Sequence, residues 1–240
     1  MRHRLGCGVS LIKYLGNLGY GSRREVTALV SARRVTALDG RAVMSSDPWV
    51  HTDLRIDGEP LDPAPGVVVI LHKPVGFVCS TQDVPPLIYD LLPARFARRT
   101  PVIAPVGRLD RDTSGLLLLT DDGALNHRLT SPRSQLSKTY RVTLAHPLTG
   151  NEAAIFSGGT LRLRGEDTPL LPATLTVLNA QTAEMTIHEG RYHQVRRMFV
   201  AVGNHVTALH RVAIGGLTLS DVDLGTWRVL TDQELGLLPG

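Results

Sequence analysis

The chain has 240 residues, of which 42% are hydrophobic and 20% charged, and a formal net charge of +4. This composition is typical of a folded globular protein with room for one medium and one small domain. We expect neither a membrane-spanning helix nor a signal peptide, because no apolar run approaches the ~20 residues that span a bilayer. The two cysteines, Cys7 and Cys79, give neither a disulfide framework nor a zinc-binding spacing, which favours a reduced, cytoplasmic setting.

The positive charge is concentrated near the N-terminus. Residues 9–41 contain six lysines and arginines against two acidic residues, and residues 1–8 add two arginines. The rest of the chain, 42–240, is therefore slightly acidic. A partner that carries phosphate groups is the usual reason for such asymmetry, and the alternative is a solvated basic surface.

Two helices are expected in this basic region. Leucine and isoleucine recur on one helix face in residues 11–18. The sequence SRRE at 22–25 has the form of a capping box, in which serine and glutamate satisfy free N–H groups at a helix start. Arg23 and Arg24 occupy the first turn, where the helix dipole disfavours cations, so an external anion explains them better. With a strand and turn at 35–41, these helices predict a compact RNA-binding module.

The sequence changes character after the stiff stretch DPAPG at 62–66, which we interpret as the boundary between domains at 9–62 and 66–240. Beyond it, strand patterns outnumber helix patterns and do not alternate with them regularly, which favours an α+β fold. The expected elements are strands at 67–71, 116–119, 140–144, 175–177 and 185–187, a loop-rich insertion at 75–100, and a helix over 195–202 that ends at Gly203.

Three segments concentrate unusual residues: GRLDRDTSGLLLLTDDG at 107–123, KTY at 138–140 and EGRYHQVRRM at 189–198. Taken singly, each has a plain structural explanation. Asp110 is either a cap or ion-pair residue or a reactive carboxylate at the edge of the leucine-rich core. Tyr140 is either a half-buried core residue or part of a binding surface.

Other catalytic chemistries fit these segments less well. A carboxylate metal site is disfavoured because Asp110 and Asp112 would point to opposite faces of an extended chain, with arginines beside them. The sequence contains no glycine-rich phosphate loop, dinucleotide fingerprint or nucleophile-elbow serine, and Glu189 and His193 lack the order of a zinc-protease motif. These residues therefore disfavour a zinc enzyme and an enzyme with a nucleotide cofactor.

Together, the three segments resemble the motifs of the pseudouridine synthases, in the form used by the RsuA-like branch. Asp110 falls in the central motif, Tyr140 in the tyrosine motif and residues 189–198 in the third motif. LHKPVG at 71–76 is similar to the family's first motif, and residues 9–41 look like an S4 RNA-binding domain. The resemblance covers nearly the whole chain.

This resemblance implies a catalytic domain built on a mixed, largely antiparallel sheet with a central cleft, preceded by a small S4-like (αL-type) domain. It also implies an enzyme that uses no metal and no organic cofactor. The implied reaction is isomerisation of uridine in RNA, in which the N1–C1′ bond breaks, the uracil rotates and a C5–C1′ bond forms. By this resemblance Asp110 is the catalytic carboxylate, Tyr140 the aromatic partner of the base, and Arg196 the cation that pairs with Asp110. Asp110 would attack C1′, add to C6 or remove the 2′ proton, and the sequence does not choose among these.

The resemblance also implies RNA-binding residues. Arg108 would fill the stack vacated by a flipped uridine or hold a phosphate group. The S4-like domain would dock on a neighbouring RNA helix through phosphates, which gives affinity more than base specificity. The other residues expected to bind substrate or RNA are Lys73, Arg191, His193, Gln194, Arg197, Arg23, Arg24 and Arg34.

The third motif, with LHR at 209–211, looks most like the branch that acts on 16S rRNA, whereas close relatives acting on 23S rRNA usually differ around Tyr192 and His193. We therefore expect a cytoplasmic, monomeric enzyme, not bound to membranes, that modifies 16S rRNA in a partly assembled small subunit. The alternatives are a 23S rRNA enzyme of the same family, a non-catalytic rRNA-binding assembly factor, and a metal-dependent nucleic-acid hydrolase. Intact Asp110, Tyr140 and Arg196 argue against a pure binding protein.

Overall fold

The computed structural model describes residues 9–80 and 83–238, so Cys7 and the arginines before it lie outside the described residues. The chain forms two compact units. The first contains the described residues through Val67 together with Leu92–Ala104 and Thr120–Gly123, and the second contains Val68–Leu91, Pro105–Leu119 and the remainder from Ala124. The division after Val67 lies next to the expected boundary at 62–66, but the two later segments of the first unit were not expected there.

A buried ion pair explains why these later segments belong to the first unit. Arg99 Nη2 lies 2.7 Å from Asp121 Oδ2, and both side chains are almost fully buried. The other carboxylate oxygen of Asp121 accepts a hydrogen bond from the Gly66 N–H, and Arg99 also donates to the Pro63 carbonyl. A buried charge requires partners of this kind, so the pair joins three stretches of chain that are far apart in sequence.

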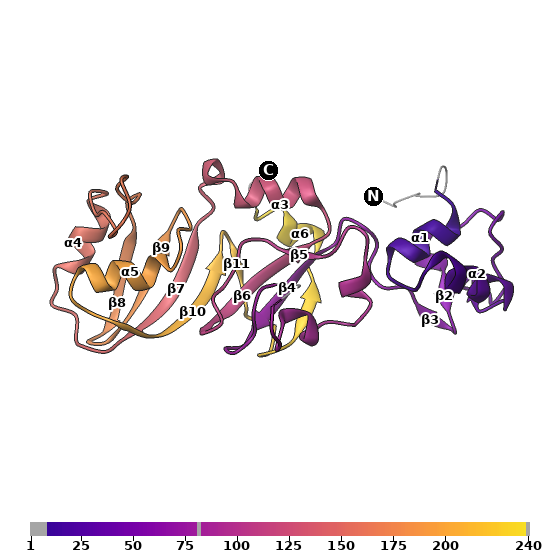
Figure 1. The fold of residues 1–240 in the computed structure, drawn as a ribbon, viewed down its shortest axis with the longest axis horizontal. Helices are drawn as coiled ribbons and strands as arrows, with labels where there is room; N and C mark the ends of the chain where they lie inside the picture. The colour runs from indigo at the N-terminus through magenta and orange to yellow at the C-terminus, as the bar shows by residue number, and fades with distance from the viewer. Residues whose placement is uncertain (1–8, 81–82, 239–240) are drawn as a thin grey trace. The chain divides into compact units, whose positions relative to one another are not determined.

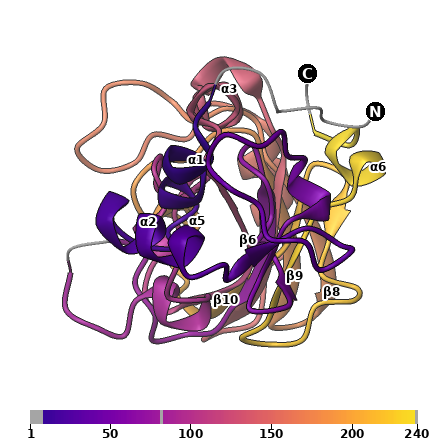
Figure 2. The same ribbon diagram turned by 90° about the vertical axis from the view of Figure 1, so that its right-hand side faces the viewer.

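The first unit consists of two short helices and a three-stranded antiparallel sheet in the order β1-β2-β3. The capping box predicted at Ser22 is confirmed, since Glu25 N–H donates to Ser22 Oγ and the Ser22 N–H donates to the Glu25 carboxylate. Helices α1 and α2 lie side by side (Figure 2) and share one apolar core with the strands. The elements are α1 (Leu11–Asn17), α2 (Arg23–Ser31), β1 (Val35–Thr36), η1 (His51–Asp53), β2 (Arg55–Ile56), β3 (Glu59–Pro60) and η3 (Phe96–Arg98).

The second unit is built on a nine-stranded sheet whose main path runs β12-β4-β6-β10-β7-β9-β8 (Figure 1). Strands β6 and β10 pair in parallel, whereas β10–β7, β7–β9, β9–β8 and β12–β4 pair antiparallel. The expected α+β fold with a mixed, largely antiparallel sheet is therefore confirmed. The strands are β4 (Val68–Lys73), β5 (Ala104–Pro105), β6 (Thr113–Thr120), β7 (Lys138–Leu144), β8 (Thr174–Asn179), β9 (Thr182–Ile187), β10 (Val206–Ile214), β11 (Leu217–Thr218) and β12 (Trp227–Val229).

Short helices accompany this sheet. Phe156 of α4 and Phe199 of α5 meet edge to face with ring centroids 5.3 Å apart, which joins these two helices. In the part of the chain that the structure describes, no helix has the length and apolar character needed to cross a membrane. The helices are α3 (Gly123–Thr130), α4 (Glu152–Ser157), α5 (Gln194–Ala201) and α6 (Asp232–Leu235), with single turns at η2 (Ile88–Leu91) and η4 (Pro132–Ser134).

Strand β6 forms the centre of the core, as the leucine run predicts. Leu116 to Leu119 are all fully buried. Gly115, just before them, has φ +114°, and a Cβ atom there would collide with the backbone of Arg211 in β10. Glycine is thus required where β6 and β10 approach each other, because any side chain would push the parallel pair apart.

Candidate active site

A cleft of about 1160 Å³ in the second unit is lined by residues of all three motifs. Asp110 comes from the loop before β6, Tyr140 from β7, and His193 from the turn before α5. Segments separated by tens of residues therefore converge on one cavity, which is large enough to hold a nucleotide.

The loop that carries Asp110 is fixed from below by a buried lysine. Lys73 is fully buried, and its Nζ donates to the carbonyls of Pro74 (3.0 Å), Asp110 (3.1 Å) and Thr113 (2.7 Å). Burial lowers the pKa of Lys73. All three donors of its ammonium group are used inside the protein, so RNA contact by Lys73 stays a prediction and would require the side chain to give up one of these hydrogen bonds.

Within this loop Leu109 is buried and Arg108 is exposed, and both residues line the cleft. The Asp110 side chain is 36% exposed, and one carboxylate oxygen lies 3.4 Å from His193 Nε2. The loop thus anchors itself through an apolar residue and leaves a carboxylate facing the cavity.

Tyr140 lies on a buried arginine that the sequence analysis did not identify as a site residue. Arg211 is 1% exposed, donates from Nε to the Leu116 carbonyl (2.7 Å) and from Nη1 to the Tyr140 hydroxyl (3.3 Å), and lines the cleft. Its guanidinium carbon is 5.9 Å from the centre of the Tyr140 ring. The available signal was an arginine in a strand that is largely apolar, without a nearby acid in the sequence.

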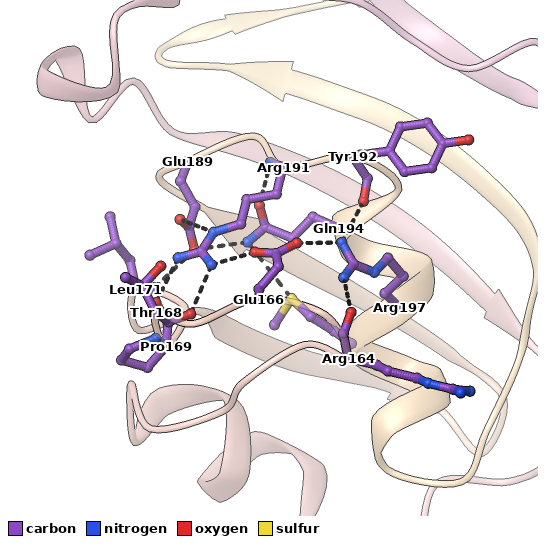
Figure 3. A network of polar contacts seen from close by, with 11 residues as sticks. Arg164, Glu166, Thr168, Pro169, Leu171, Glu189, Arg191, Tyr192, Gln194 and Arg197 are labelled. Carbon is purple, nitrogen blue, oxygen red and sulfur yellow. Dashed lines mark hydrogen bonds and ion pairs between the residues drawn. The ribbon is translucent and has the colours of Figure 1, made fainter.

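The third motif is held by a network of ion pairs centred on Glu166 (Figure 3). Its two carboxylate oxygens bind Nη1 of Arg191 and Nη1 of Arg197. Arg191 also binds Glu189 (3.0 Å) and the carbonyls of Thr168 and Pro169, while Arg197 donates to the Arg164 carbonyl. Gln194 joins the network through its amide, which donates to Glu189.

This network changes the interpretation of three predicted RNA contacts. Arg191, Gln194 and Arg197 make their polar contacts within the protein, and Gln194 is buried. Arg191 and Arg197 lower the pKa of Glu166, which keeps the central carboxylate ionised. These three side chains shape the turn before α5, and Arg191 and Gln194 also line the cleft, so their contact with RNA stays a prediction.

That turn has a constrained backbone. His193, the N-cap residue of α5, has φ 48° and ψ 33°, which is the left-handed region that favours glycine. A histidine is held there because hydrogen bonds fix both sides of it, from the Arg191 N–H to the Gln194 side chain (2.9 Å) and from the Arg197 N–H to the His193 carbonyl (3.0 Å). The ring is thereby directed at Asp110.

Comparison with known proteins identifies the family. Residues 67–201 match the RNA pseudouridylate synthases. Ribosomal small subunit pseudouridine synthase A of Yersinia pestis is 45% identical over 231 residues, covering 94% of this chain and 96% of that protein. The protein of the same name from Escherichia coli K12 is 46% identical over 187 residues, 76% of this chain and 79% of that protein. This chain belongs to the pseudouridine synthase family.

A solved structure agrees with this family assignment. The crystal structure of a pseudouridylate synthase that is 39% identical superposes with a TM-score of 0.68 and covers 97% of this chain and 100% of its own. The resemblance stated from the four motifs is confirmed, since both sequence and fold match along almost the whole chain.

One feature expected of this family member differs in the structure. Arg196 does not pair with Asp110 but with Asp112, whose Oδ2 lies 2.8 Å from Arg196 Nη2. The reason is the register of the sheet. Leu209 of β10 lies opposite Thr113 of β6, so the start of β10 lies near Asp112. Arg196, which donates to the Val206 carbonyl (3.2 Å), is thereby brought to Asp112.

The three arginines expected to bind RNA in the first unit differ in their surroundings. Arg23 and Arg24 are exposed in the first turn of α2 and form no ion pair with any residue that the structure describes. Arg34 is exposed too, but it binds both carboxylate oxygens of Asp57, at 2.7 and 2.5 Å. RNA contact by these residues stays a prediction, and Arg34 would have to exchange its aspartate for a phosphate.

Proposed function

We propose that this protein isomerises one specific uridine of 16S rRNA to pseudouridine. The observation that carries the proposal is a partly exposed carboxylate, Asp110, in a nucleotide-sized cleft that Tyr140 also lines, in a chain of the pseudouridine synthase family. Small-subunit rRNA as the substrate is supported by relatives at 45–46% identity that are named ribosomal small subunit pseudouridine synthase A.

The reaction requires the target base to leave its helix. A stacked uracil is inaccessible, so the nucleotide is flipped into the cleft, which requires on the order of a few kcal/mol. Tyr140 offers a flat face to the base, and Arg211 holds its hydroxyl in one position. We propose that Arg108, which is exposed and lines the cleft, occupies the vacated stack or binds a phosphate.

Asp110 is the group that starts the bond changes. The N1–C1′ bond breaks, the uracil rotates, the C5–C1′ bond forms, and the C5 proton is lost while N1 gains one, so the product is an isomer. Attack at C1′, addition at C6 and removal of the 2′ proton all require an ionised carboxylate. The Asp110 side chain is 36% exposed and His193 Nε2 lies 3.4 Å from it, so the carboxylate faces the cavity in which the base would lie.

The first unit supplies affinity for the RNA. We propose that it acts as an S4-like domain and that Arg23 and Arg24, exposed in the first turn of α2, bind phosphates of a helix near the target. Contacts of this kind position the enzyme without reading bases. We further propose that the protein acts as a monomer in the cytoplasm on a partly assembled small subunit, where the target uridine is still accessible.

Mapping of pseudouridine tests the proposal. Transcribed 16S and 23S rRNA and partly assembled subunits are incubated with wild-type protein, Asp110→Asn, or the control Asp167→Asn, which alters an exposed aspartate outside the cleft. Carbodiimide modification and primer extension then locate new sites. We expect one new pseudouridine in 16S rRNA with wild type and control and none with Asp110→Asn. A new pseudouridine only in 23S rRNA would overturn the assignment of 16S rRNA as the substrate. No new pseudouridine in any of these RNAs would favour a non-catalytic RNA-binding factor.

A further inference from the structure

Tyr192 is exposed in a way that its role in the fold does not explain. Its relative exposure is 76%, and among the phenylalanine, tyrosine and tryptophan residues that the structure describes it alone is mostly exposed. Its ring points away from the Glu166 network (Figure 3). Exposed large apolar side chains at a cleft mark a surface for a ligand rather than a packing element.

The ring is nevertheless held in one place. It stacks on the His193 ring, with centroids 3.9 Å apart and planes inclined by 17°. The Tyr192 carbonyl accepts a hydrogen bond from Arg197 Nη1 (3.2 Å), and the Glu166 network fixes Arg197 in turn. A ring that is immobilised before binding loses little conformational freedom when a ligand stacks on it.

The position of the ring relates it to the reacting carboxylate. His193 connects Tyr192 to Asp110, since one face of its ring contacts Tyr192 and its Nε2 lies 3.4 Å from Asp110 Oδ1. Both aromatic residues line the same cleft as Asp110. A nucleotide whose sugar and base are at Asp110 therefore has its chain neighbour close to Tyr192.

We propose that Tyr192 is a stacking platform for the base of a nucleotide that directly flanks the target uridine. This inference rests on the proposed function and adds a subsite to it. Flipping the uridine removes a stacking partner from the bases on either side, and an aromatic face restores one. Single-stranded RNA is commonly bound by splaying bases onto tyrosine and other aromatic rings, without regard to base identity.

A cycle of protein and RNA changes tests this directly. The RNA is a transcribed 16S fragment that contains the mapped uridine, either intact or with one abasic nucleotide on its 5′ or its 3′ side. We measure Kd and single-turnover rate for wild type, Tyr192→Ala, Tyr192→Phe and Val200→Ala. Val200 is a matched apolar control, because it is exposed on α5 and does not line the cleft.

Removal of the stack should weaken binding of intact RNA by about fivefold to 100-fold in Tyr192→Ala, with near-normal Kd in Tyr192→Phe and Val200→Ala. When the abasic nucleotide replaces the base that stacks on Tyr192, the affinity of the wild type should fall by the same factor. The affinity of Tyr192→Ala should not fall further with this RNA. The proposal would be overturned if Tyr192→Ala bound intact RNA and both abasic RNAs more weakly than wild type by the same factor. It would also be overturned if the Kd of Tyr192→Ala for intact RNA lay within twofold of the wild-type value. Failure of the proposed function is distinct, because wild-type protein would then form no pseudouridine in the intact fragment.

Discussion

The two walls of the cleft are positioned by opposite means. The wall that carries Asp110 rests on Lys73, a fully buried cation that binds only backbone carbonyls and makes no ion pair with a residue the structure describes. The wall that carries His193 rests on Glu166, a partly exposed carboxylate shared by two arginines. The first is a set of hydrogen bonds shielded from water, and the second is an ion-pair network that water and salt can reach. We infer that the wall that carries Asp110 is the more rigid one. The position of the wall that carries His193 should be more sensitive to pH and salt.

Removal of the buried cation should have the largest effect. Lys73→Met leaves three buried or partly buried carbonyls without their shared donor, so we expect the free energy of unfolding to fall by about 1.5–3 kcal/mol. Lys13→Met, the same change at an exposed position in α1, should change it little. Chemical denaturation of both variants measures the difference. Equal stability of the two variants would mean that Lys73 does not support the Asp110 loop.

The contact beneath Tyr140 should affect turnover next. Arg211→Lys keeps the charge but cannot bond the Leu116 carbonyl and the Tyr140 hydroxyl with the same planar group. Because one such hydrogen bond contributes about 0.5–1.5 kcal/mol, kcat should fall roughly threefold to tenfold. The same change in a Tyr140→Phe background should have a smaller effect on kcat. An undiminished effect there would show that Arg211 acts otherwise than through the tyrosine hydroxyl.

The Glu166 network should respond to acid. Arg191 and Arg197 lower the pKa of Glu166 below its usual 4.5, so its contribution to stability is complete above the pKa of the unfolded chain and is lost as pH falls through the lower, folded-state pKa. Glu166→Gln should lower Tm at neutral pH by less than Lys73→Met does, and the difference in Tm from wild type should narrow as the pH falls below the usual 4.5 of a glutamate. Thermal melts across this range, with Asp167→Asn as control, measure the gap. A gap independent of pH would argue against the ion pairs.

The contact between the walls should have the smallest effect. Arg196 and Asp112 form an ion pair in which the aspartate side chain is 68% exposed, so a double-mutant cycle with Arg196→Gln and Asp112→Asn should give a coupling of about 0.2–1 kcal/mol. High salt should reduce this coupling, because mobile ions screen exposed charges. A coupling free energy of several kcal/mol would contradict this expectation and would make the Arg196–Asp112 pair one of the main interactions that stabilise the cleft.

Local sequence patterns predicted the parts of the molecule that local interactions determine. The capping box at Ser22, the buried leucine strand and the helix ending before Gly203 all depend on residues within a few positions of each other. Family motifs then predicted that Asp110 and Tyr140 share a cleft. The pairing of Arg196 was wrong because it depends on the register between β6 and β10, which no local pattern contains.

Partners from unpatterned loops could not be predicted either. Glu166 lies in a loop without regular structure, yet it determines the surroundings of two arginines 25 and 31 positions later. Lys73 and Arg211 are basic residues that chemistry alone would place on the surface, and their burial becomes apparent only when the carbonyls and the hydroxyl they bind are known. A sequence motif can indicate which residues lie close together in the fold. Which of their hydrogen-bond donors are already bound within the protein depends on the folded structure.

The left-handed backbone at His193 has a consequence for any attempt to make this protein more heat-resistant. Glycine and asparagine adopt that conformation with less strain, so a design procedure guided by backbone preference alone would replace the histidine. The replacement would raise the melting temperature while removing the ring that lies between Tyr192 and Asp110. We therefore expect thermostability and activity to be in conflict at this position, and a thermostable variant that keeps its activity to gain its stability elsewhere.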